Sequence, residues 1–224
     1  MCIICVSGKG VRQPNEKEIR TMFKRNPHGA GYMVAEHGKV RIEKGFMTVT
    51  ELLRSLRYEK FTEKDVVVYH FRISTQAGVN PEMTQPFPMV RELESTKYLS
   101  TLSSVGVAHN GIIRLTTDPN EIEYSDTALF VSMYLPDILQ KKADLKDKKV
   151  LDKIEKMIQS KMVILDWNGD IALIGDFVRR DGLLFSNYSF QDYTYSPKYF
   201  TLEDVKHWRK VVGFEDVFDD EFED

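Results

Sequence analysis

The chain has 224 residues, of which 42% are hydrophobic and 11% aromatic, and its formal net charge is −3 at pH 7. A chain of this size can bury a large core, and its nearly balanced charge excludes the basic footprint of a general nucleic-acid binder. We find no run of about 18 apolar residues and no signal-like segment, and the cysteines suit a reducing compartment, so we expect a cytoplasmic protein without a membrane span.

Strand signals, which are short runs rich in β-branched and aromatic residues, recur along most of the chain. Asn168-Gly169 is the dipeptide most typical of a tight hairpin turn and separates the last two runs. The predicted strands are Ile3–Val6, Gly31–Ala35, Lys39–Glu43, Val66–Phe71, Val105–His109, Met162–Asp166 and Ile171–Gly175.

Helix signals alternate with these strands. Thr48 and Glu51 have the spacing of a capping box, which marks the beginning of a helix. The Lys- and Asp-rich stretch Gln140–Lys149 is interpreted as a solvated helix end or loop. The predicted helices are Glu16–Lys24, Glu51–Tyr58, Thr127–Leu139 and Val150–Ser160. The pattern predicts a mixed α and β protein, and because no linker or repeat divides it, residues 1–224 are expected to form a single domain.

Cys2 becomes the first residue if Met1 is removed, as is normal when the next side chain is small. One residue would then carry a thiol and a free α-amino group, which titrate near 8.5 and about 7.7–8.0 respectively. A side-chain nucleophile paired with an N-terminal amine is an established arrangement for acyl transfer. Cys2 is therefore a candidate nucleophile that carries its own base.

Three further segments belong to the same pattern. They are Tyr69–Gly78, which contains His70, Arg72 and Thr75; Val107–Ile113, which contains His109-Asn110-Gly111; and Tyr124–Thr127, which contains Ser125-Asp126-Thr127. An N-terminal Cys followed in order by H-x-R-x-x-T, H-N-G and S-D-T resembles the class II glutamine amidotransferase family of N-terminal-nucleophile hydrolases. The resemblance covers nearly the first 130 residues. It implies an α+β fold, the four-layer αββα sandwich of that class.

The resemblance also implies roles for individual residues. Cys2 would attack the amide, and the Asn110 side chain with the Gly111 N–H would stabilise the oxyanion. Arg72 would hold the substrate carboxylate with its planar fork, and Asp126 would accept hydrogen bonds from the substrate ammonium. Thr75 and Gln76 would complete the glutamine pocket. No cofactor and no metal is implied.

Local sequence leaves some of these residues with alternative roles. Ser125 or Asp126 could instead be the N-cap of a helix, and Asn110-Gly111 could be a turn that ends a strand. A papain-like pairing of Cys2 with His70 or His109 is conceivable, although a His in an apolar strand is usually a satisfied core residue.

Cys2 and Cys5 form a C-x-x-C pattern, but residues three apart on a strand point to opposite faces. No second cysteine pair completes a zinc ribbon. We therefore expect no structural zinc, and Cys5 is interpreted as a small buried hydrophobic residue.

The sequence predicts a free-standing, glutaminase-type enzyme that releases glutamate and ammonia, because no residues remain for a synthase domain. The substrate would be glutamine or a related amide, and a separate synthase would be the partner that accepts ammonia. Two alternatives remain: an N-terminal cysteine amidase acting on another amide, and a non-enzymatic interaction module on a retired hydrolase fold. The segment Phe214–Asp224, an acidic tail with a Phe stripe, would pack on its own domain or dock a partner.

Overall fold

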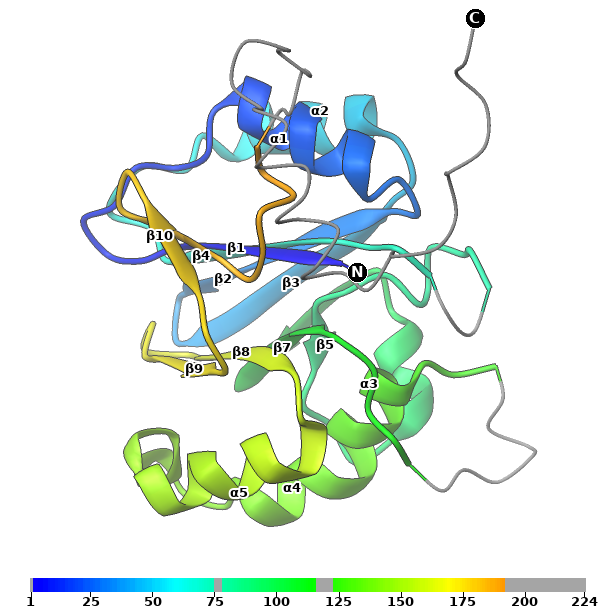
Figure 1. Cartoon of the computed structure of the whole chain (residues 1–224), viewed down its shortest axis with the longest axis vertical. Coiled ribbons are helices and arrows are strands. Elements are labelled where there is room, and N and C mark those ends of the chain that lie inside the picture. The colour runs from blue at the N-terminus through cyan, green and yellow to red at the C-terminus, as the bar shows by residue number, and fades with distance from the viewer. Residues whose placement is uncertain (1, 75–77, 116–122, 192–224) are drawn as a thin grey trace, which may run out of the picture. The chain divides into compact units, whose positions relative to one another are not determined.

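The computed structural model describes residues 2–74, 78–115 and 123–191 (Figure 1). Thr75, Gln76 and the segment Phe214–Asp224 lie outside the described residues, so the expectations about them stay predictions. None of the helices in the described ranges is both long and apolar enough to cross a membrane.

Seven strands form one antiparallel sheet: β1 (Ile3–Ser7), β2 (Ala30–Glu36), β3 (Lys39–Phe46), β4 (Val67–Phe71), β6 (Ser100–Ser103), β10 (Val178–Arg180) and β11 (Leu183–Phe185). Their order is β10-β11-β1-β4-β2-β3-β6, so β1 is an inner strand between β11 and β4. The first strand of the chain is thus held on both sides by antiparallel partners, one of which comes from the end of the described chain.

Four strands form a second antiparallel sheet in the order β5-β7-β8-β9: β5 (Phe87–Pro88), β7 (Val105–Asn110), β8 (Lys161–Asp166) and β9 (Ile171–Ile174). The predicted late hairpin is confirmed, because β8 and β9 pair antiparallel with Met162 opposite Ile174. Gly169 has a φ of +84° in the connecting turn, a conformation that favours glycine.

Two helices, α1 (Glu16–Arg25) and α2 (Val49–Glu59), cover one face of the seven-stranded sheet (Figure 1). Both helices begin with a capping box, formed by Asn15 with Glu18 in α1 and by Thr48 with Glu51 in α2. The predicted Thr48 cap is therefore confirmed.

The two sheets pack against each other through their other faces. In β1, Ile4 and Val6 belong to a buried cluster that also contains Ala108 of β7 and Val163 of β8. The alternate residue Cys5 belongs to the cluster under α1 and α2, as expected from the twofold alternation of a strand. The prediction that Cys5 is a buried hydrophobic residue is confirmed.

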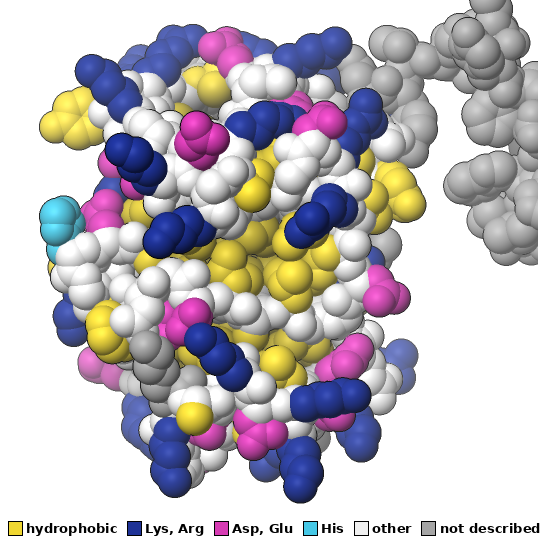
Figure 2. All heavy atoms as spheres, turned by 90° about the vertical axis from the view of Figure 1, so that its left-hand side faces the viewer, with side chains coloured by type: hydrophobic (Ala, Val, Ile, Leu, Met, Phe, Trp, Pro, Cys, Tyr) yellow, Lys and Arg dark blue, Asp and Glu magenta, His cyan; other side chains and the backbone are white. Residues whose placement is uncertain are grey.

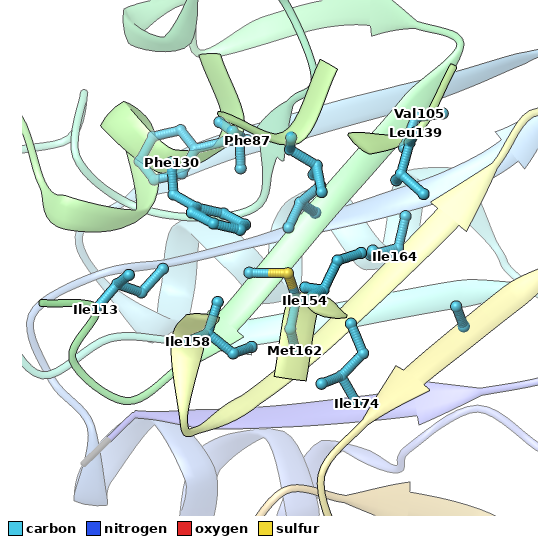
Figure 3. Packing of buried hydrophobic residues seen from close by; sticks show 14 of the residues in the cluster. Phe87, Val105, Ile113, Phe130, Leu139, Ile154, Ile158, Met162, Ile164 and Ile174 are labelled. Carbon is cyan, nitrogen blue, oxygen red and sulfur yellow. The ribbon is translucent and has the colours of Figure 1, made fainter. Parts of the chain in front are cut away.

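Three helices cover the outer face of the four-stranded sheet: α3 (Asp126–Leu129), α4 (Leu135–Ile138) and α5 (Lys148–Ile158). Figure 3 shows this packing, in which Phe130, Ile154 and Ile158 lie over Met162 and Ile174. The expectation of a mixed protein of helices and sheets is confirmed.

The predicted helix Thr127–Leu139 is interrupted, which corrects the sequence interpretation. A π-helical turn, Phe130–Tyr134, lies between α3 and α4, and Pro136 stands in the first turn of α4. Proline has no N–H to donate to the preceding turn, which accounts for a local change of helical pitch. The stretch Gln140–Lys149 contains a short 3₁₀ helix, Lys142–Lys146, before α5 begins.

Four short strands, β5, β6, β10 and β11, are not indicated by the sequence patterns.

Figure 2 views the side of the molecule on which β9 and β10 lie, and hydrophobic side chains gather near its middle with Lys and Arg around them. Ile171, Phe177 and Leu184 are only partly buried against the cluster between the sheets. Leu173 of the edge strand β9 is exposed.

Candidate active site

The β1–β4 register brings Cys2 beside the end of β4. Ile3 pairs with Phe71, so Cys2, directly before β1, lies next to Arg72 and Ile73, directly after β4. The backbone N–H of Ile73 donates to Sγ of Cys2 at 3.3 Å, and Sγ lies 3.5 Å from the Ile73 carbonyl oxygen. Burial raises the pKa of the Cys2 thiol, while the Ile73 hydrogen bond and the charge of Arg72 favour the thiolate.

Arg72 is buried and its backbone is fixed by a neighbouring segment. Its N–H donates to the carbonyl of Gly29 at 2.8 Å, and its carbonyl accepts from the N–H of His28 at 3.0 Å. The N–H of Ser74 donates to Nδ1 of His28 at 2.9 Å. Gly29 has a φ of +103°, and a Cβ there would lie 2.5 Å from Cγ2 of Thr84, so no larger residue fits.

Asp126 is the first residue of α3, and its carboxylate is tied to the backbone. Oδ2 accepts from the N–H of Ile113 at 2.6 Å, and Oδ1 accepts from the N–H of Thr127 at 2.7 Å. The N-cap itself is Ser125, whose hydroxyl accepts from the N–H of Ala128 at 3.2 Å. Ser125 is therefore the N-cap of α3, and the Asp126 carboxylate instead accepts from the backbone N–H groups of Ile113 and Thr127.

The charge of Arg72 acts on both Cys2 and Asp126. Burial lowers the pKa of the Arg72 guanidinium, and interactions with Cys2 and Asp126 oppose that shift. Burial raises the pKa of the Asp126 carboxyl, while its backbone hydrogen bonds and the charge of Arg72 act against the rise. One buried cation thus stands within electrostatic reach of both a thiol and a carboxylate.

Asn110 and Gly111 lie at the end of β7. Nδ2 of Asn110 donates to Oγ of Ser186 at 2.9 Å, whereas its Oδ1 is buried without a hydrogen-bond partner among the described residues. The two ends of an amide have nearly the same shape, so the group can be turned over. Oδ1 would then accept from the Ser186 hydroxyl, and the NH₂ group would point to the position without a partner, where it could meet an oxyanion.

Gly111 is required by close packing. A Cβ at this position would lie 2.3 Å from Cβ of Ser160 and 2.9 Å from its Oγ. Because Gly111 has no side chain, its backbone can lie close to Ser160.

Ser186 and Asn187, directly after β11, are residues that the sequence reading missed. Nδ2 of Asn187 donates to the carbonyl oxygen of Cys2 at 2.6 Å. Oγ of Ser186 accepts from the N–H of Ile4 at 2.9 Å. The sequence signal that could have found them is the Asp181-Gly182 turn before the apolar run Leu183–Phe185, which is typical of a short returning strand.

His70 and His109 are core residues. Nε2 of His70 lies 3.1 Å from the carbonyl oxygen of His109, and the His109 ring lies between the hydroxyls of Thr127 at 2.8 Å and Ser160 at 2.7 Å. Burial lowers the pKa of each imidazole to about 3. Neither ring is hydrogen bonded to Cys2 in the described part of the chain, so the papain-like pairing is not formed.

Within the described ranges, we find no group of three or more His, Cys, Asp or Glu side chains that could hold a metal ion. The β1–β4 pairing instead places the Cys2 thiol beside the buried residue Arg72, whose charge also acts on the pKa of the Asp126 carboxyl. Asn110 is connected to β1 through Ser186.

No model of a known protein family matches the sequence, and no curated protein sequence does. Among solved structures, the fold is similar to glutamine phosphoribosylpyrophosphate amidotransferase from B. subtilis complexed with ADP and GMP, with a TM-score of 0.49 and 16% sequence identity. The similarity covers 83% of this chain and 42% of that chain, so this chain spans less than half of that protein. It is too low to assign that protein's activity to this chain.

Proposed function

We propose that this protein is an N-terminal-nucleophile amide hydrolase of the class II glutamine amidotransferase type, with Cys2 as its nucleophile after Met1 is removed. The observation that carries the proposal is the β1–β4 pairing, which places Cys2 beside the buried residue Arg72, whose charge also acts on the pKa of Asp126. An amino acid with a side-chain amide presents a carboxylate, an ammonium and a reactive carbonyl. A cation, an anion and a thiol are the groups that would bind these three.

In this proposal, glutamine binds with its α-carboxylate on Arg72 and its α-ammonium on Asp126. The guanidinium offers two parallel N–H donors to a carboxylate and stays charged when buried. Thr75 and Gln76 would complete the pocket at the segment that follows Ser74. The fold would be the four-layer αββα sandwich of this class of hydrolases, with α1 and α2 on one side and α3 to α5 on the other.

The reaction would begin when the free α-amine of Cys2 takes the thiol proton and Sγ attacks the amide carbon. The carbonyl π electrons move to oxygen, and the oxyanion is stabilised by the Asn110 amide and the Gly111 N–H. When the tetrahedral intermediate collapses, the C–N bond breaks and ammonia leaves with the proton that the amine held. The thioester is then attacked by water, which releases glutamate and restores the thiol.

Ammonia formed in this way would pass to a separate synthase that uses it as a nucleophile. The acceptor is not specified by any residue of this site. The family that the sequence resembles commonly has Gly after the nucleophile, whereas this chain has Ile3, whose side chain is fully buried in the cluster under α1 and α2. The presence of Ile3 in place of Gly favours a second candidate function. In that candidate the protein is an N-terminal cysteine amidase that acts on an amide other than glutamine.

The test is the intact mass of the purified protein with and without a glutamine analogue in which a diazoketone replaces the amide. This group alkylates a thiol and loses dinitrogen. We expect loss of the Met1 mass, one adduct per chain on Cys2, and no adduct in Cys2→Ala. Glutamate release is measured in parallel.

Retained Met1 without an adduct would contradict the proposal and favour the interaction module. An adduct with a neutral thiol reagent but not with the analogue, and no glutamate release, would favour an amidase for another amide.

A further inference from the structure

The segment after β11 runs beside the first residues of β1. Cys5 pairs with Phe185, and the N–H of Ser186 donates to the carbonyl of Ile4 at 3.0 Å. In return, the N–H of Ile4 donates to the Ser186 hydroxyl at 2.9 Å. The next residue, Asn187, lies beside Cys2, from which it is separated by most of the chain.

The backbone of Cys2 is held at its carbonyl by a side chain. Nδ2 of Asn187 donates to the Cys2 carbonyl oxygen at 2.6 Å, and Oδ1 of the same amide accepts from the N–H of Ser189 at 2.9 Å. The bond to Ser189 closes a local turn that fixes the Asn187 side chain. The donor of the amide is therefore aimed at Cys2 by its own acceptor.

This contact matters because Cys2 would be the terminal residue of the processed protein. Terminal residues fray unless something fixes them. Fixing the Cys2 carbonyl restricts rotation about the bond between Cα and the carbonyl carbon, and this sets the directions in which the amine and the thiol point. Misplacing a reacting group by about 1 Å can cost on the order of 100-fold in rate.

Ser186 connects the same segment to other groups around the site. Its hydroxyl also contacts the side-chain amide of Asn110, and its carbonyl accepts from Nζ of Lys161 at 2.8 Å. Ser186 is fully buried, so these contacts are shielded from water. The backbone of Ser186, directly before Asn187, is thus held by β1 and β8 through contacts that do not need the Ser186 hydroxyl.

We propose that Asn187 is a positioning residue that orients the nucleophilic residue Cys2 through its carbonyl. The inference rests on the proposed function and adds to it a residue that touches no substrate. It acts through Cys2, so it contributes to turnover far more than to substrate binding.

Two variants separate this role from a merely structural one. Asn187→Asp keeps an oxygen that accepts from the N–H of Ser189 but cannot donate to the Cys2 carbonyl when ionised. Asn187→Ala loses both contacts and adds no charge. Ser189→Ala, which keeps the backbone N–H of the same turn, is the matched control.

We expect kcat for glutamine to fall by about 10- to 100-fold in both Asn187 variants, with KM changed less than about threefold, because orientation and not binding is lost. Ser189→Ala should keep the wild-type kcat. A loss of the same size in Asn187→Ala and Asn187→Asp would show that added charge is not its cause. Wild-type kcat in Asn187→Asp together with a low value in Asn187→Ala would mean that only the turn matters, and would overturn the proposal.

A second measurement does not depend on glutamine as the substrate. The rate at which iodoacetamide alkylates Cys2 is followed by mass spectrometry across a pH series, and we expect it to be lower in both Asn187 variants at neutral pH. If the wild type releases no glutamate, the proposed function fails while this comparison still decides the role of Asn187. Equal alkylation profiles in all variants would refute that role.

Discussion

The Sγ atom of Cys2 accepts a hydrogen bond from the backbone N–H of Ile73 at 3.3 Å. A main-chain donor favours the thiolate without adding a titratable group to the site. It also opposes the effect of burial, which raises the pKa of this thiol. The thiolate of Cys2 is therefore stabilised by a backbone N–H whose position is fixed by the pairing of β1 with β4.

Cys2→Ala should abolish glutamine hydrolysis without loss of the fold, because the change removes one thiol from a half-buried position before β1. Glutamate release and thermal unfolding are measured on the same preparation. Cys5→Ala is the matched control, since Cys5 is fully buried on the opposite face of β1. It should keep activity and lose about 1 kcal/mol of stability. Hydrolysis by Cys2→Ala at the wild-type rate would exclude the mechanism.

Arg72→Lys should weaken glutamine use strongly although the charge is kept. An ammonium cannot reproduce the two-pronged geometry of the guanidinium, and a buried lysine gives up its proton more easily. Steady-state kinetics should show a raised KM and a lower kcat/KM for glutamine, with little change for an amide that lacks the α-carboxylate. Wild-type kinetics in this variant would remove the carboxylate-binding role of Arg72 and favour the amidase for another substrate.

Acid should destabilise this protein through its buried histidines. Burial lowers the pKa of His70 and His109 to about 3, whereas an unfolded histidine titrates near 6.5. Between these pH values the unfolded state binds more protons than the folded state. The contribution of the two neutral histidines to the free energy of unfolding is therefore complete above about pH 6.5 and is lost as the pH falls toward about 3.

Each histidine should contribute a slope of up to about 1.4 kcal/mol per pH unit in this window. Urea unfolding of the wild type at several pH values measures that slope, and His109→Gln should reduce it. An unfolding free energy that does not change between pH 6.5 and 4 would contradict the prediction.

Much of the fold follows from local patterns in the sequence. The β8–β9 hairpin was predictable because Asn168-Gly169 specifies a tight turn, and α2 because Thr48 and Glu51 form its cap. The interrupted helix was less accessible, because the apolar pattern continues through Pro136 and hides the change of pitch.

Local motifs mark only some of the candidate site residues. Arg72, Asn110 and Asp126 stand in recognisable segments, whereas the turn and short apolar run before Asn187 indicate a strand but not the strand with which it pairs. Asn187 lies 185 residues from Cys2 in sequence, and only the pairing of β11 with β1 brings the two together. Contacts of this kind depend on strand order, which periodicity does not determine.

Ser186→Ala should lower both stability and turnover, for two separable reasons. The stability loss should be about 1–3 kcal/mol, because the buried N–H of Ile4 would lose its acceptor, and urea unfolding measures it. The turnover loss should arise through Asn110, whose amide contacts the Ser186 hydroxyl. The two effects can therefore be separated with a double-mutant cycle.

In such a cycle, Asn110→Ala alone should lower kcat by on the order of 100- to 1,000-fold, since one oxyanion donor is removed. Adding Ser186→Ala to Asn110→Ala should then lower kcat little further, because the group through which Ser186 acts is already absent. The stability loss from the Ile4 contact should persist in the double variant, since Asn110 does not supply that acceptor. If the two kcat losses instead multiply, Ser186 does not act through Asn110, and the orientation of the oxyanion amide must be set by another contact.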